Sequence, residues 1–145
     1  MNNQTGDDGS AIVEFLGVAL LLLVPVVYLV LVLGQLQAAA FAVEGAARQA
    51  ARTLVTADEE EAGMRRAIAS VGIALADQGF TDAPEQATTV ACPGGCVVPG
   101  GSATVTVGID VVLPGVPGWL HDVVPLAIGV EATATAQRDS FVGVG

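Results

Sequence analysis

The sequence predicts an α+β protein. A long N-terminal helix, transmembrane at first and then an amphipathic stem, leads to a second helix and a small antiparallel sheet packed on the stem. Three features of the 145-residue chain predict this fold: a long apolar run, alanines at helical spacing behind it, and Val- and Thr-rich segments of alternating polarity. We expect a leader at 1–9, a transmembrane helix at 10–34, its amphipathic continuation at 35–57, a second helix at 58–79 and a small antiparallel β domain at 84–145.

The apolar run forms the first part of the long helix. From Phe15 to Leu33 no side chain is charged, and the Tyr28 hydroxyl is its one strong hydrogen-bonding group. A helix needs about 20 apolar residues to cross the hydrocarbon core of a bilayer, and Ile12 and Val13 extend the run to that length. A core helix of a soluble protein would show a polar face, and this run shows none. We therefore expect a single membrane span.

Two questions about this segment stay open from sequence. A secretory signal peptide cut near residues 38–40 is an alternative, although no positive charge precedes the run and it exceeds the usual length of about 7–15 apolar residues. Charge does not fix the orientation either, because the nearest basic residues, Arg48 and Arg52, lie well beyond the span.

The helix is expected to continue to about Val55. Glu44 and Arg48 stand in the favourable i, i+4 order on its polar side, and Pro25 and Gly34 are the positions where it can kink. Small and apolar residues at alternating spacings of four and three form a seam on one face. Small residues let helices approach closely, so the seam can pack on a partner helix, on the chain's own sheet, or on both. The helix-packing seam comprises Leu36, Ala40, Val43, Ala47, Ala50 and Leu54.

A second helix is predicted from Asp58. Asp58 and Glu61 fit a capping box, and the acidic run 58–61 suits a helix N-terminus better than a cation site. Gly79 is expected just beyond the C-terminal end. The buried face is predicted to comprise Met64, Ile68, Val71 and Leu75.

Three strands are predicted at 86–91, 103–113 and 126–137. The last alternates most clearly: the even-numbered residues Leu126 to Ala136 are apolar, and the odd-numbered ones between them are mostly polar. Such a one-sided antiparallel sheet needs an apolar cover on its inner face, and the helical seam is the obvious candidate.

Cys92 and Cys96 bracket a Pro-Gly-Gly turn. A structural zinc site needs four ligands, and the chain has two cysteines and one histidine. The spacing is also not that of a C-x-x-C redox motif. A disulfide closing the turn suits an oxidising compartment, with two buried free thiols as the alternative. Closing so short a loop would contribute about 2 kcal/mol.

No pattern predicts an enzyme, a metal site or a cofactor. His121, the only histidine, falls in the Pro-bounded segment 116–125, and a neighbouring aspartate alone does not make it a catalytic base. No Gly-rich segment has the context of a phosphate-binding loop. The formal charge is −10, from 15 acidic residues against five arginines, which excludes the usual electrostatics of nucleic-acid binding.

Glu14 is the residue that makes the span more than an anchor. A carboxylate beside a membrane span costs a few kcal/mol if it enters the bilayer unpaired. It stands five residues after Gly9 in the segment GSAIVEF, residues 9–15, directly before the apolar run. This arrangement, with Pro25 early in the span, resembles the processing site of type IV pilin-like proteins, and most of all the TadE-type minor pilins and pseudopilins of the tight-adherence (Flp) pilus.

The resemblance implies how the chain matures and assembles. A prepilin peptidase would cut after Gly9, so that Ser10 becomes the first residue, Glu14 the fifth and Phe15 the sixth. The other partners would be pilin subunits, the pilus assembly platform and the membrane, with the C-terminal domain extracytoplasmic. A buried charge is tolerated when paired, so Glu14 could pair with the Ser10 amine of a neighbouring subunit. The alternative is an unprocessed single-pass protein whose extracytoplasmic domain binds or scaffolds a partner.

Overall fold

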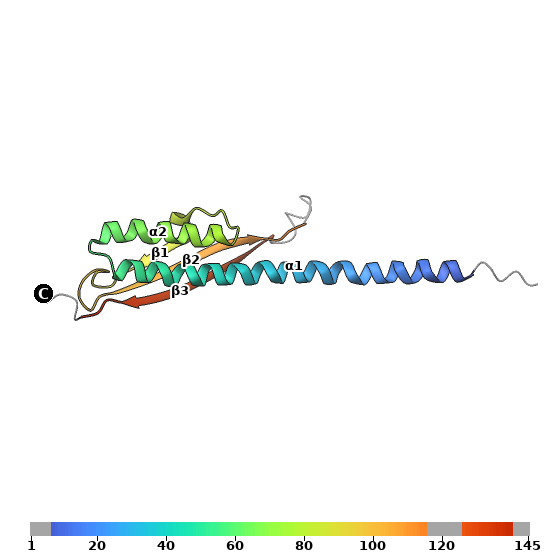
Figure 1. Cartoon of the computed structure of the whole chain (residues 1–145), viewed down its shortest axis with the longest axis horizontal. Helices are drawn as coiled ribbons and strands as arrows, with labels where there is room; N and C mark the ends of the chain where they lie inside the picture. The colour runs from blue at the N-terminus through green and yellow to red at the C-terminus, as the bar shows by residue number, and fades with distance from the viewer. Residues whose placement is uncertain (1–6, 116–125, 141–145) are drawn as a thin grey trace, which may run out of the picture. The chain divides into compact units, whose positions relative to one another are not determined.

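The computed structural model describes residues 7–115 and 126–140 of the chain. It confirms the α+β class, with a long apolar N-terminal helix, a second helix and a three-stranded antiparallel sheet (Figure 1). The segment 116–125 with His121, the tail after residue 140 and the start of the leader lie outside the described residues. The elements are α1 (Asp7–Val55), α2 (Glu60–Asp77), α3 (Pro84–Ala87), β1 (Thr88–Ala91), β2 (Ser102–Val112) and β3 (Ala127–Gln137).

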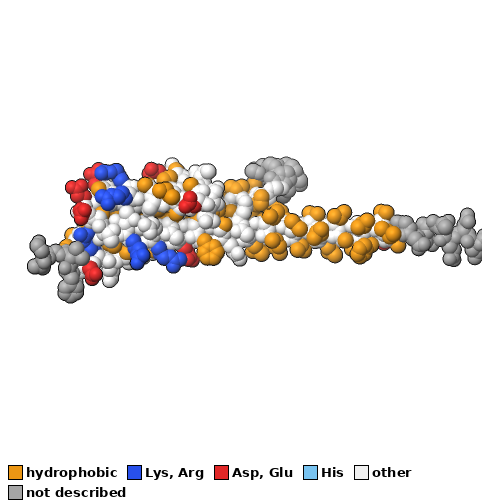
Figure 2. Space-filling view, viewed as in Figure 1, with side chains coloured by type: hydrophobic (Ala, Val, Ile, Leu, Met, Phe, Trp, Pro, Cys, Tyr) orange, Lys and Arg blue, Asp and Glu red, His pale blue; other side chains and the backbone are white. Residues whose placement is uncertain are grey.

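The chain divides into two compact units at Gly34, and α1 contributes to both. The helix is continuous through Pro25 and Gly34 and ends at Val55, as its sequence predicts. In the first unit the described side chains from Ser10 onward are almost all exposed. Figure 2 shows hydrophobic side chains over this part of α1 and charged ones over the second unit.

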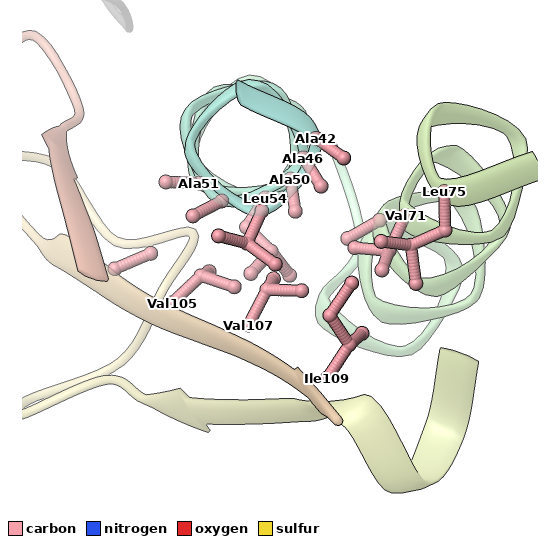
Figure 3. Close-up of a cluster of buried hydrophobic side chains, with 14 of the residues drawn as sticks. Ala42, Ala46, Ala50, Ala51, Leu54, Val71, Leu75, Val105, Val107 and Ile109 are labelled. Carbon is pink, nitrogen blue, oxygen red and sulfur yellow. The ribbon is translucent and has the colours of Figure 1, made fainter. Parts of the chain in front are cut away.

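The second unit is two helices on one face of the sheet. Figure 3 shows Leu54 of α1 and Val71 and Leu75 of α2 directed toward the same core as Val105 and Val107 of β2. All five side chains are fully buried. The core is built mainly from alanine on α1 and from valine on the central strand.

The strands are ordered β1-β2-β3, and both pairs are antiparallel. Along β2 the odd-numbered residues Ala103 to Val111 are buried. Two of them face smaller residues on β3, with Val105 paired to Ala134 and Val107 to Ala132. The predicted two faces of β3 are confirmed over residues 130–137, where even-numbered residues are half-buried and odd-numbered ones exposed.

The helical seam packs inside this protein. Val43, Ala47, Ala50 and Leu54 are buried in the core shared with α2 and β2, and Leu36 packs against it. The structure shows the seam in one core with the chain's own sheet, which is one of the two alternatives from sequence, and also with α2, which the sequence does not indicate as its partner. The buried part of the seam is therefore not available to a partner helix.

The start of α2 differs from the prediction. The helix begins at Glu60, with Glu59 as a cap residue that makes no side-chain capping hydrogen bond, so the Asp58–Glu61 capping box is wrong. The Glu61 carboxylate instead accepts a hydrogen bond from Arg65 at 2.6 Å. Because Glu59 is the cap residue, Glu61 is the second helical residue and not the third, which is the position that a capping box requires.

The end of α2 confirms the role of Gly79. Its φ of 82° is left-handed, and its N–H donates to the Ala76 carbonyl at 2.9 Å, while the Phe80 N–H donates to the Leu75 carbonyl at 3.0 Å. These two bonds are the Schellman motif. The predicted buried face is confirmed at Val71 and Leu75, whereas Met64 and Ile68 are only half-buried.

The first predicted strand begins two residues late. Residues 86 and 87 belong to α3, whose first residue is Pro84, and the N–H groups of Gln86 and Ala87 both donate to the Ala83 carbonyl at 3.0 Å. Proline is favoured at the first position of a helix because its φ is already helical. The strand proper is therefore Thr88–Ala91.

Candidate functional site

The predicted processing segment lies in the first turns of α1. Gly9 and Ser10 are helical, and the side chains of Ser10, Glu14 and Phe15 are exposed. Phe15 leaves 70% of its surface uncovered. The segment is thus an exposed helical stretch that leads without a break into the apolar part of the helix.

Glu14 is the one carboxylate along this stretch of α1 between Ser10 and Phe41. The ion pairs among the described residues are Glu44–Arg48 and Glu61–Arg65, both in the second unit. No lysine or arginine occurs before Arg48 in the sequence. A cation for Glu14 in an apolar environment must therefore come from an amino terminus or from another molecule.

The remaining predicted site residues lie in the second unit. Cys92 and Cys96 form a disulfide, with their Cα atoms 5.0 Å apart. The turn between them has positive φ at Gly94 and Gly95, 86° and 105°, values that glycine adopts at little cost. Cys96 is fully buried and belongs to the core, so the disulfide ties the connection between β1 and β2 to the packed interior.

An open groove runs between α1 and β3. It consists of two adjoining hollows of about 860 and 550 Å³. Arg48 and Arg52 lie on the helix side, and Ala134 and Thr135 on the strand side. Among the described residues, the polar side chains that line the two hollows are those of Arg, Glu, Gln and Thr, so the groove offers polar contacts.

The outer face of the sheet is polar. The Thr104 and Thr135 hydroxyl groups are hydrogen-bonded at 2.9 Å, and those of Thr106 and Thr133 at 2.8 Å. Cross-strand threonine pairs of this kind stabilise a sheet while leaving its face wettable.

Sequence reasoning missed the role of Arg138. Its Nη1 donates hydrogen bonds to the carbonyl oxygens of Val55 and Ala57, and its backbone N–H donates to the Gly101 carbonyl. One residue thus joins the end of β3, the end of α1 and the start of β2. In the sequence, Arg138 is a single arginine just after the last predicted strand. That position does not indicate which residues, more than 80 positions away, its side chain contacts.

Comparison of the chain with models of known protein families, with curated proteins and with solved structures finds no match.

Proposed function

We propose that this protein is a TadE-like minor pilin or pseudopilin, cut by a prepilin peptidase after Gly9 and assembled through its N-terminal helix into a tight-adherence (Flp) pilus or a related secretion apparatus. The observation that carries the proposal is the placement of Gly9, Ser10 and Glu14 directly ahead of an exposed apolar helix. That helix is continuous with the stem of a small α+β unit.

The exposed apolar side chains of the first unit require a cover. A mean hydropathy of 3.0 in its most apolar window, with none of that window buried, suits a lipid environment. In the proposed function the membrane covers this helix before assembly, and the helices of neighbouring subunits cover it in the filament. The second unit lies outside the cytoplasm, which agrees with its disulfide.

Glu14 sets the register of assembly in this proposal. Cleavage leaves a positively charged amine on Ser10, and this amine in a neighbouring subunit neutralises the Glu14 carboxylate. The pair makes one axial stagger favourable, because any other stagger leaves two charges unpaired among apolar side chains.

The N-terminal sequence and intact mass of the protein from native membranes test the proposal. Ser10 as the first residue in cells with the peptidase, and Met1 or Asn2 in cells without it, is the expected result. Gly9→Lys should block cleavage, whereas Gly6→Lys, the matched change elsewhere in the leader, should not. An intact N-terminus in all strains would favour the unprocessed anchored scaffold, and a first residue near 41 would favour a secreted form.

A further inference from the structure

Strand β3 is an edge of the sheet, because β2 is its one neighbour among the described strands. It pairs with β2 one residue to one along its whole length, so it has no bulge. Its sequence, AIGVEATATAQ, contains neither proline nor lysine, and Glu131 is its one charged residue. Natural edge strands are usually kept from further pairing by such residues, by bulges or by being short. An edge strand of 11 residues without these features is open to pairing with a further strand.

Hydrogen bonds next to the two ends of β3 show which of its backbone groups face outward. The Leu126 carbonyl accepts a bond from the Leu113 N–H, and the Arg138 N–H donates to the Gly101 carbonyl. Backbone groups of successive residues in a strand point to opposite edges. The even-numbered residues of β3 therefore bond to β2, and the N–H and C=O groups of its odd-numbered residues point toward the free edge.

The groove between α1 and β3 lies along this free edge, and Figure 1 shows the two elements side by side. Its larger hollow, of about 860 Å³, is lined by Arg48 and Arg52 of α1 and by residues 134–137 of β3. Arg48 pairs with Glu44 at the surface. Arg52 is exposed and makes no ion pair or side-chain hydrogen bond with the described residues. Its guanidinium group is therefore available to a ligand in the groove.

The charge of the larger hollow is opposite to that of the whole protein. The formal charge of the chain is −10, and a smaller hollow of about 370 Å³ is lined by Asp82 and Asp110. In the larger hollow, by contrast, Arg48 and Arg52 are the charged residues among the described ones that line it. A ligand that binds there against the overall negative charge is expected to carry negative charge itself.

The spacing of the two arginines matches the repeat of a strand. Arg48 and Arg52 are four residues apart on α1, which is about 6 Å along the helix axis. Side chains on one face of a strand repeat every second residue, which is about 6.6 Å. Acidic side chains on alternate residues of a strand laid along β3 would therefore meet both arginines.

We propose that the free edge of β3 binds an extended segment of another protein that carries acidic side chains on alternate residues. The segment adds a further antiparallel strand to the sheet, a mode of binding in which main-chain hydrogen bonds give affinity and side-chain contacts give specificity. A second copy of this chain fits less well, because the side chains of its own β3 that would enter the groove are alanines. The inference goes beyond the proposed function and depends on neither the membrane span nor cleavage after Gly9.

The proposed pairing fixes the role of each residue in the bound segment. Directly opposite residues of an antiparallel pair have their side chains on the same face. Residues opposite the odd-numbered residues of β3 bond to the free edge and direct their side chains to the outer face, which carries Thr133 and Thr135. The acidic residues lie opposite Ala132, Ala134 and Ala136, with their side chains in the groove and their N–H groups directed away from β3.

Fluorescence anisotropy of a labelled peptide, titrated with the full-length protein in nonionic detergent at low salt, tests the inference. The peptide alternates Thr and Glu, and the control peptide has the same composition in two blocks. We expect the alternating peptide to bind at least tenfold more tightly. N-methylation of its Thr residues, whose N–H groups face β3, should abolish binding. N-methylation of its Glu residues, whose N–H groups face away, should change the affinity less than twofold.

Arg52→Gln should weaken binding of the alternating peptide at least fivefold. Arg66→Gln is the matched control, because it removes the same charge from an exposed position on α2. Equal binding of the alternating and block peptides, or equal effects of the two N-methylations, would mean charge attraction without strand pairing and would overturn the inference. Equal effects of the two arginine substitutions would also overturn it. So would the absence of binding at about 1 mM peptide, whether the edge is free or occupied by a second copy.

Discussion

Arg138 and Val55 stand 83 residues apart in the sequence, and the Arg138 guanidinium donates a 3.0 Å hydrogen bond to the Val55 carbonyl. The same nitrogen lies 2.6 Å from the Ala57 carbonyl. The last carbonyls of a helix have no partner within it, and a cation near them is favoured by the helix dipole. Arg138 thus closes the C-terminal end of α1 with a group supplied by the end of the sheet.

Replacing Arg138 by alanine should lower the free energy of unfolding by about 1.5–3 kcal/mol, the range for hydrogen bonds to a charged group. Urea unfolding of the detergent-solubilised protein, followed by circular dichroism, measures the change. Arg66→Ala is the control, because Arg66 is exposed and makes no ion pair or side-chain hydrogen bond with the described residues. Equal effects of the two substitutions would show that the Arg138 contacts add nothing to stability.

Two glycines of the helices should respond oppositely to alanine. At Gly45 an added Cβ meets nothing within 4 Å, whereas at Gly63 it would lie 2.7 Å from the Cβ of Ala57. Gly45→Ala should therefore stabilise the protein by about 0.5–1 kcal/mol through helix propensity, and Gly63→Ala should destabilise it by about 1–3 kcal/mol through overpacking. Melting temperatures that shift in the same direction would contradict this assignment.

The loss in free energy of unfolding when a side chain of the stem is truncated should depend on whether that side chain is buried. Leu54 is fully buried between the sheet and α2, and Phe41, on the same helix, leaves 73% of its surface exposed. Leu54→Ala should cost about 2–5 kcal/mol, and Phe41→Ala less than about 0.5 kcal/mol. Chemical denaturation of both variants measures the difference, and a Phe41 effect as large as that of Leu54 would mean that Phe41 is covered in the protein as it is isolated.

The Cys92–Cys96 disulfide should contribute measurably to stability, and its presence in cells should indicate the compartment of the second unit. Replacing Cys92 and Cys96 together by alanine should cost about 2 kcal/mol for a loop of this length. Protein in unbroken cells should react with a thiol-specific polymer reagent only after reduction. Immediate modification without reductant would place free thiols in the native protein and argue against an oxidising, extracytoplasmic second unit.

Local pattern predicted most of the fold, and long-range contacts account for what it missed. The alternation along β3 and the apolar run of α1 repeat at the period of their own element, so each is visible in a short window. The pattern predicts strand at residues 86 and 87 because the Thr- and Val-rich residues 88–90 follow them directly, whereas the structure places these two residues in α3. The predicted Asp58–Glu61 capping box is wrong because the helix begins one residue later, with Glu59 as its cap residue. The residues that contact the seam and Arg138 are determined by tertiary packing. The periodicity of a short sequence window does not specify such contacts.

For the processing segment in the first unit, the sequence predicts which residues matter and how they are spaced, but not what Glu14 pairs with. The spacing of Gly9, Ser10 and Glu14 is visible in the sequence, and the structure adds that the segment is helical and that the Ser10 and Glu14 side chains are exposed. The proposed partner of Glu14 is a terminus created by cleavage on another molecule, which a single chain does not contain. The test of that residue must therefore be made on assembled material.

Glu14→Gln should separate maturation from assembly. The amide keeps the size and polarity of the side chain but cannot neutralise the Ser10 amine of a neighbour, so that amine would be left unpaired among apolar side chains, at a cost of about 3–5 kcal/mol. We expect cleavage after Gly9 to persist and the amount of protein in sheared filaments to fall at least tenfold, as measured by quantitative immunoblotting. Glu44→Gln is the matched control, since Glu44 pairs with Arg48 on the exposed side of the stem. Normal incorporation of Glu14→Gln would exclude the charge pair as the determinant of register, even if processing at Gly9 were established.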